Sequence, residues 1–105
     1  MAPVIEVGTK LYLRQYTGNY WIDMVKDPYT VIEAKGNYLI VQECELVFAG
    51  PRYYDTVADY IMENPNGRTV KLRWSEKKMR WQETPAGSYP RVAVFGSWRH
   101  QPYLN

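Results

Sequence analysis

The chain has 105 residues, a length that fits one domain with a modest core. Hydrophobic residues make up 46% of it and charged residues 23%, proportions that exclude an intrinsically disordered protein. The net charge of +2 is lower than dedicated nucleic-acid-binding proteins usually carry, and it is unevenly spread. Residues 1–50 hold four basic and six acidic side chains, whereas residues 51–105 hold nine basic and five acidic ones.

The aromatic composition is unusual, because ten tyrosines and four tryptophans accompany only two phenylalanines. Tyr and Trp combine an apolar ring with a polar group. This combination suits half-exposed strand positions in a small β domain, and it also suits binding faces. We favour the structural interpretation and keep the binding one open.

The single cysteine, Cys44, excludes an internal disulfide, and its place in the apolar run 39–48 predicts a buried thiol. The N-terminal sequence MAPVIEVGTK has neither the basic region nor the apolar stretch of a signal peptide. No window is long and apolar enough to span a bilayer. We therefore expect a cytoplasmic protein in a reducing compartment, without membrane contact.

The first half of the chain predicts two pairs of strands, separated by a break at Asp27-Pro28. The expected strands cover residues 10–15, 20–25, 30–34 and 38–43. Residues 17–19 form a turn signal between the first two strands. The short loop 35–37 contains a glycine and makes the second pair a β-hairpin.

Residues 51–67 change the pattern from strand to helix. Asp55 or Thr56 can cap a helix, because apolar residues follow at helical spacing. The sequence NPNG at 64–67 ends it. The prediction is a helix over residues 55–63, which is too short to be stable alone and must pack on the sheet.

Residues 68–83 predict a β-hairpin with two chemically opposite faces. A reversal around residues 76–77, or a four-residue loop over 75–78, gives one register. Its expected pairs are Trp74–Met79, Arg73–Arg80 and Leu72–Trp81. One face is then apolar, with Leu72, Trp74, Met79 and Trp81, and the other is basic, with Lys71, Arg73 and Arg80. Like charges opposite each other cost stability, which favours a use for the basic face.

A loop over residues 84–90 leads to a last strand over 91–95 and a tail that ends at residue 105. Short strands with few helical residues and no alternating βαβ order predict a mainly β, small α+β fold. We expect one domain over residues 1–105. Its form would be an SH3-like antiparallel barrel or sheet with one short helix and an added β-hairpin.

Two resemblances extend this interpretation. Residues 7–48, with VGTKLYLR and DPYTVIEAKGNYLIVQE, resemble the opening strands of SH3-like barrels in spacing and turn chemistry. The second half, from NPNGRTVKLRWSEKKMRWQ to VAVFGSWRHQPYLN, resembles small uncharacterised proteins of phages and prophages of Firmicutes-type bacteria. The block FGSWRHQPYLN carries that resemblance. It implies a bacterial host cytoplasm and a mobile-element origin, and it implies no activity.

Catalytic and metal sites lack the necessary residues. The chain has one histidine, His100, and one cysteine, Cys44, and no spacing of metal ligands. A dyad of these two would need chance proximity, and a buried thiol reacts poorly. Glu43 and Glu45 are better interpreted as a solvated stripe than as a glycosidase-like pair. The glycines are scattered singly, without a phosphate-binding loop. We expect no enzyme and no cofactor.

Two binding hypotheses remain. In the first, the protein is a nucleic-acid-binding accessory protein. Lys71, Arg73 and Arg80, with Lys77 and Lys78 at the turn, contact the phosphates of DNA or RNA, and a nearby ring stacks on a base.

In the second and preferred hypothesis, the chain is a phage or prophage accessory protein that binds a host or viral protein, for example as an anti-defence inhibitor or sponge. The tail residues Trp98, Arg99 and Tyr103 are of types enriched at interfaces, and they either fold back or reach a partner. A ligand pocket lined by tyrosines at a dimer interface, and a homo-oligomer in general, stay open.

Overall fold

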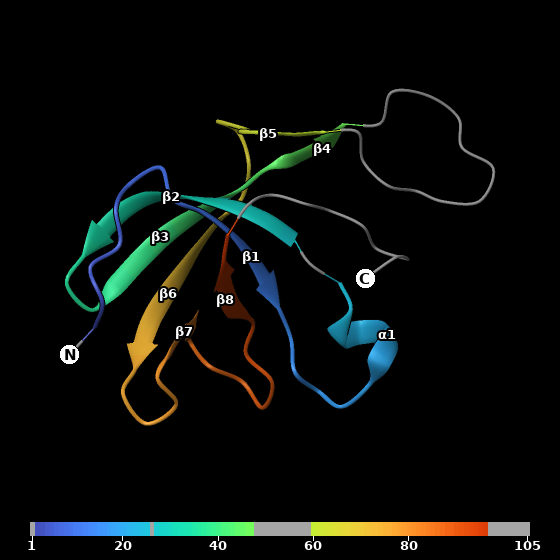
Figure 1. Ribbon diagram of the computed structural model, residues 1–105, viewed down its shortest axis with the longest axis vertical. Coiled ribbons are helices and arrows are strands. Elements are labelled where there is room, and N and C mark those ends of the chain that lie inside the picture. Colours follow the sequence, from blue (N-terminus) through green and yellow to red (C-terminus); the bar gives the residue numbers. More distant parts are fainter. Residues whose placement is uncertain (1, 26, 48–59, 97–105) are drawn as a thin grey trace.

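The computed structural model describes residues 2–25, 27–47 and 60–96, and at positions 46, 47 and 60 it describes the backbone alone. Six antiparallel strands form a closed barrel in the order β1-β2-β3-β6-β7-β8, with β8 paired to β1 (Figure 1). The barrel strands are β1 (Lys10–Arg14), β2 (Asp27–Lys35), β3 (Tyr38–Glu43), β6 (Thr69–Ser75), β7 (Arg80–Glu83) and β8 (Val92–Phe95). The predicted mainly β fold, a small SH3-like antiparallel barrel, is confirmed.

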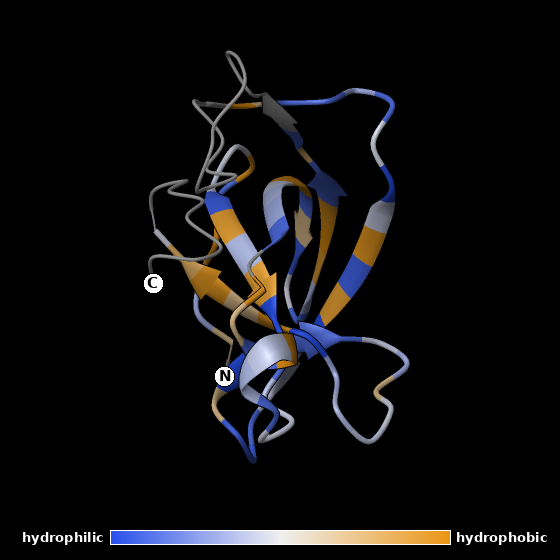
Figure 2. Ribbon diagram, turned by 90° about the vertical axis from the view of Figure 1, so that its right-hand side faces the viewer, coloured by the Kyte–Doolittle hydropathy of each residue, from blue (hydrophilic) through white to orange (hydrophobic). Residues whose placement is uncertain are grey.

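The barrel interior is filled by side chains that alternate with outward-facing ones. Figure 2 shows this alternation as hydrophobic and hydrophilic bands along the strands. The buried cluster consists of Leu11, Leu13, Tyr29, Val31, Leu39, Val41, Leu72 and Trp81. Each barrel strand except β8 contributes to it, so the period-2 pattern of the sequence directs one face of each strand inward.

The β2–β3 hairpin forms where the sequence predicts it. Lys35 pairs with Tyr38, which leaves Gly36 and Asn37 as the turn. Gly36 has a φ of 52°, a left-handed conformation that glycine adopts without strain. A β-bulge interrupts the pairing at Ile32, whose side chain is exposed. The last predicted strand is also confirmed, as β8.

The predicted strand over residues 20–25 is wrong, because the chain forms a short helix there, α1 (Tyr20–Asp23). Asn19 caps it, with Oδ1 accepting hydrogen bonds from the backbone N–H groups of Trp21 and Ile22. Local hydrogen bonds from Asn and Asp side chains offer the backbone an alternative to strand pairing. The turn signal before residue 20 was therefore a helix cap.

The predicted helix over residues 55–63 is wrong where it can be compared. Residues 55–59 lie outside the described residues, and β5 (Tyr60–Met62) pairs with β4 (Glu45–Val47) as a separate two-stranded sheet. A helix of two turns has little stability of its own, so a pairing partner on another segment overrides its propensity.

The β6–β7 hairpin has the predicted faces except at Met79, which lies in the turn, is 67% exposed and is not part of the apolar face. The predicted register of the hairpin is wrong. Its pairs are Leu72–Glu83, Arg73–Gln82, Trp74–Trp81 and Ser75–Arg80. The loop covers residues 76–79 because Lys78 N–H donates to Ser75 Oγ and Met79 adopts a φ of 54°. Compared with the predicted pairing, the observed pairing is shifted by two residues, and a shift of two keeps the side chains of both strands on their predicted faces. However, Arg73 and Arg80 are not opposite each other, so no repulsion between them across the hairpin indicates a use for the basic face.

Candidate functional site

Five of the predicted binding residues lie on β6 and β7 or in the turn between them. Lys71 and Arg73 flank the buried Leu72 on β6 and therefore lie on the outer side of the barrel. Arg80 begins β7, and Lys77 and Lys78 lie in the turn. All are exposed except Arg80, which is half-buried.

Tyr38, which the sequence did not single out, belongs to the same surface. It is opposite Arg73 in the β3–β6 pairing, and the Lys71 ammonium lies 4.6 Å from the centroid of its ring. Its hydroxyl donates a hydrogen bond to Glu33 Oε2 at 2.9 Å, which raises the pKa of the tyrosine. The surface made of Tyr38, Lys71, Arg73, Arg80 and the turn lysines is called the basic face below.

Within the part of the chain that the structure describes, most of the positive charge on the basic face is uncompensated. Arg80 Nε donates to the neutral amide oxygen of Gln82 at 2.9 Å. Arg73, Lys77 and Lys78 form no side-chain hydrogen bond or ion pair with any residue that the structure describes. The basic face can therefore bind phosphate or carboxylate groups without first breaking an ion pair to any of these described residues.

The other predicted binding residues cannot be compared with the structure. Trp98, Arg99 and Tyr103 lie outside the described residues, and so does His100. The tail hypothesis and the proximity of His100 to Cys44 therefore stay predictions.

A second candidate surface surrounds α1, beside the β7–β8 loop (Figure 1). Gln15 Nε2 donates to the carbonyl oxygen of Tyr89 at 3.0 Å and joins the two loops. Four rings are largely exposed there, namely Tyr16 at 50%, Tyr20 at 61%, Trp21 at 71% and Tyr89 at 55%. The aliphatic side chains of Ile22 and Val25 are exposed beside them. These six residues are called the aromatic end below.

The loop that carries three of these rings is held by its own polar side chains. Asp23 Oδ1 accepts hydrogen bonds from Thr17 N–H at 2.7 Å and Thr17 Oγ1 at 2.8 Å, and Oδ2 accepts one from Gly18 N–H at 2.8 Å. The backbone hydrogen bond from Thr17 is the main reason that the pKa of Asp23 is lowered. Tyr20 and Trp21 meet edge to face, with centroids 5.4 Å apart. The rings are thus presented on a pre-shaped turn.

The aromatic end does not follow from the predicted strand over residues 20–25, because a strand would not place these rings together on one loop. A usable signal was present, since Asn19 before an apolar run is a common helix cap. The polar Asp23 four residues later is consistent with a short turn that folds back on itself.

An ion-pair network lies at the same end of the barrel strands as the aromatic end. The Arg91 guanidinium lies 3.3 Å from Glu83 Oε2 and 3.5 Å from Asp27 Oδ2, and it donates to the Tyr29 hydroxyl at 3.0 Å. Burial raises the pKa of Tyr29. Because these residues come from β2, from β7 and from the position just before β8, the network fixes the strand ends to one another.

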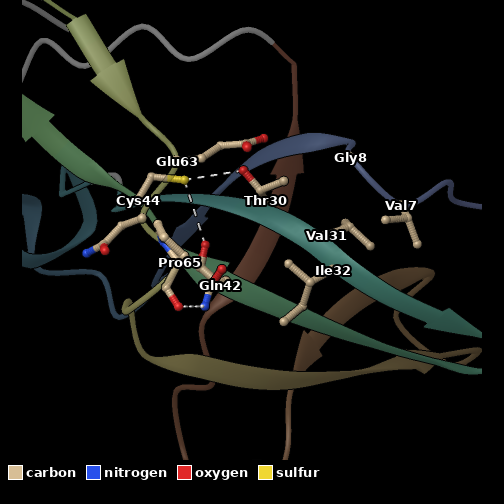
Figure 3. Close-up of a pocket in the computed structure, with 10 residues that line it drawn as sticks. Val7, Gly8, Thr30, Val31, Ile32, Gln42, Cys44, Glu63 and Pro65 are labelled. Carbon is tan, nitrogen blue, oxygen red and sulfur yellow. Dashed lines mark hydrogen bonds between the residues drawn. The ribbon is translucent and has the colours of Figure 1, made fainter.

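A groove of about 310 Å³ lies on the outer side of β2 and β3 (Figure 3). Val7, Ile32 and Pro65 line it, together with Cys44, which is only 7% exposed. The thiol lies 3.3 Å from Thr30 Oγ1, and burial raises its pKa. The predicted buried thiol is confirmed, and its raised pKa keeps it in the poorly nucleophilic neutral form.

Among the described residues, no group of three or more His, Cys, Asp or Glu side chains is placed to hold a metal ion. Within the same residues, no helix has the length and apolar character needed to cross a membrane.

The chain was compared with protein-family models, with curated proteins and with solved structures, and none of the three comparisons found a match.

Proposed function

We propose that this chain is a non-enzymatic accessory protein that binds another protein through its aromatic end. The observation that carries the proposal is the exposure of four Tyr and Trp rings on two joined loops. Large exposed apolar patches on small proteins commonly mark interaction sites, and Trp and Tyr are enriched among the residues that dominate binding energy.

The aromatic end is pre-shaped, which favours binding. Asn19 and Asp23 fix the turn through backbone N–H groups, so little loop entropy is lost when a partner docks. Tyr and Trp side chains have only two rotatable bonds each and therefore give a large contact area at a small entropic cost.

The charges of this end favour a protein partner over a nucleic acid. The Arg14 guanidinium lies 4.7 Å from the centroid of the Tyr16 ring, and Asp23 uses both carboxylate oxygens internally. Nucleic-acid affinity depends on cations that neutralise phosphates. Among the described residues, the aromatic end offers rings and aliphatic groups but few such cations.

We further propose that the partner is a host or phage protein in the cytoplasm of a bacterial host cell. The resemblance of the second half to proteins of phages and prophages of Firmicutes-type bacteria supports this setting. An inhibitor or sponge that acts against a host defence system needs a binding surface and no catalytic group, which agrees with the neutral, buried thiol of Cys44.

The proposal can be tested by quantitative affinity capture from a lysate of such a bacterium, with three forms of the full chain as bait. Trp21→Ser removes the most exposed ring of the aromatic end. Met79→Asn is the matched control, because Met79 is 67% exposed in the β6–β7 turn and Asn tolerates its left-handed backbone.

We expect a protein that the wild type and Met79→Asn retain equally, and whose capture falls by about tenfold or more with Trp21→Ser. Equal capture by all three forms would contradict the proposal. So would a set of proteins lost equally with both variants, because that result would indicate nonspecific apolar binding.

A further inference from the structure

The basic face combines an aromatic ring with cations that form no ion pair with any described residue, and the proposed protein-binding function does not use it. We propose that it is a second binding site, for single-stranded nucleic acid. Lys71, Arg73 and Arg80 contact successive phosphates, and Tyr38 stacks on a base. The proposal is independent of the aromatic end, since the β6–β7 turn and the β7–β8 loop lie at opposite ends of β7.

The positions of the cations suit an extended phosphate chain. Lys71 and Arg73 are two residues apart on one strand, which separates them by about 6.6 Å along β6. Arg73 on β6 is opposite Gln82 on β7, and Gln82 accepts the hydrogen bond from Arg80. The guanidinium of Arg80 is therefore held beside the guanidinium of Arg73. The charged groups therefore form a stripe across two strands, not a single point.

Tyr38 supplies a ring on which a base can stack, which the charged side chains alone do not provide. Its hydroxyl is fixed by Glu33 on β2, so the ring has a set orientation on the outer side of β3. The Lys71 ammonium rests on the ring at 4.6 Å, a contact that depends on the negative potential of the ring face. When the Lys71 ammonium binds a phosphate instead of the ring, the ring face becomes available to a base.

A single strand fits this surface better than a duplex does. The ring lies on the outer side of a sheet, where it can stack only on a base that is not already stacked inside a double helix. Small barrels that bind single strands use the same combination of stacking rings and surrounding cations. An acidic protein segment would pair with the cations but would gain nothing comparable from the ring.

The uncompensated cations predict strong salt dependence. Three phosphate contacts give a slope of log affinity against log salt of about −2 for a single strand. The net charge of the whole chain is only +2, so binding is best measured at low salt, and the affinity should fall by roughly 16-fold between 50 and 200 mM salt.

The test is fluorescence anisotropy with a labelled oligodeoxythymidine strand and the full-length chain. The triple variant Lys71→Ala/Arg73→Ala/Arg80→Ala should lose measurable binding. Tyr38→Ala should weaken binding by about tenfold and leave the salt slope unchanged, because it removes a stacking contact and no cation.

Two controls separate these effects from damage to the fold. Tyr38→Phe loses the hydrogen bond to Glu33 but keeps the ring, so it should retain most of the affinity that Tyr38→Ala loses. Lys10→Ala changes the net charge by one unit on β1, three strands away from β6 in the barrel order, and should change affinity less than twofold. Circular dichroism spectra of all variants should match the wild type.

Several results would overturn the proposal. These are no binding of the wild type at low salt, equal binding of duplex and single strand, or an unchanged affinity in Tyr38→Ala. Equal binding of polyglutamate or of anionic lipid vesicles would also overturn it, because it would show a general affinity for negative charge. None of these results bears on the aromatic end, so the two proposals fail separately.

Discussion

The aromatic end and the basic face solve the same problem, how to present side chains to a partner, in two different ways. At the aromatic end, short polar residues tie a loop to itself, and Asp23 alone accepts three hydrogen bonds. On the basic face, the barrel strands do the positioning, because Tyr38, Lys71 and Arg73 alternate with buried side chains on β3 and β6. The first surface therefore depends on local polar contacts, and the second depends on the core.

The largest effect is expected in the barrel core, because both surfaces require a folded barrel. Leu72 is fully buried on β6, beneath the basic face. We expect Leu72→Ala to lower the free energy of unfolding by about 2–5 kcal/mol and to weaken both surfaces together. Urea denaturation followed by tryptophan fluorescence measures this loss. Val94→Ala, at an exposed position of β8, should stay within about 0.5 kcal/mol of the wild type. A similar cost for the two variants would contradict the assignment of the core.

A smaller effect should be confined to the aromatic end. Asp23→Asn removes the charge and replaces one of the two acceptor oxygens with an NH₂ group. We expect the backbone amides of Thr17 and Gly18 to exchange hydrogen faster, while the amides of β6 keep their protection. The matched control is Glu6→Gln, which makes the same charge change at an exposed position. If exchange accelerates equally in β6, the loop is not the independent unit described above.

The loop of the aromatic end should also respond to acid through Asp23. The pKa of Asp23 in the folded chain lies below its ordinary value of 3.8. The contribution of this carboxylate to loop order is therefore present above the unfolded pKa and is lost as the pH falls through the folded pKa. In an NMR titration, the amide signals of Thr17 and Gly18 should shift only below about pH 4, and a midpoint above 4 would contradict this account.

The smallest effect concerns Glu33, a carboxylate that is hydrogen-bonded to the basic face. Glu33→Gln removes its charge and keeps an acceptor for the Tyr38 hydroxyl. We expect the affinity for an oligodeoxythymidine strand to rise by about twofold. The pKa of Tyr38 should fall toward its ordinary value, which absorbance in alkaline solution can follow. An equal or weaker affinity would mean that the charge of Glu33 does not oppose binding of the strand.

The sequence predicted those parts of the fold that local patterns determine. The β2–β3 hairpin follows from the loop at Gly36, and the two faces of the β6–β7 hairpin follow from the alternation of apolar and basic residues. The register of that hairpin could not be predicted from the sequence. Its loop ends at Met79, which has a left-handed backbone conformation, whereas a glycine or asparagine is the usual signal for that conformation.

The candidate surfaces were predicted only in part, for the same physical reason. The cations of the basic face lie on one hairpin and were found from their spacing. Tyr38 joins them through the pairing of β3 with β6, which are far apart in the sequence. The aromatic end depends on side-chain capping by Asn19 and on the hydrogen bond between Gln15 and Tyr89. Neither contact produces a periodic pattern in the sequence.

The separation of the two surfaces can be tested most directly by one NMR titration of the labelled full-length chain with an oligodeoxythymidine strand at low salt. We predict that the amide signals of β3, β6 and the β6–β7 turn shift in a saturable way, while those of Tyr16, Tyr20, Trp21 and Tyr89 stay in place. Shifts centred on these four residues, or spread evenly over the barrel, would contradict the account of two independent binding surfaces.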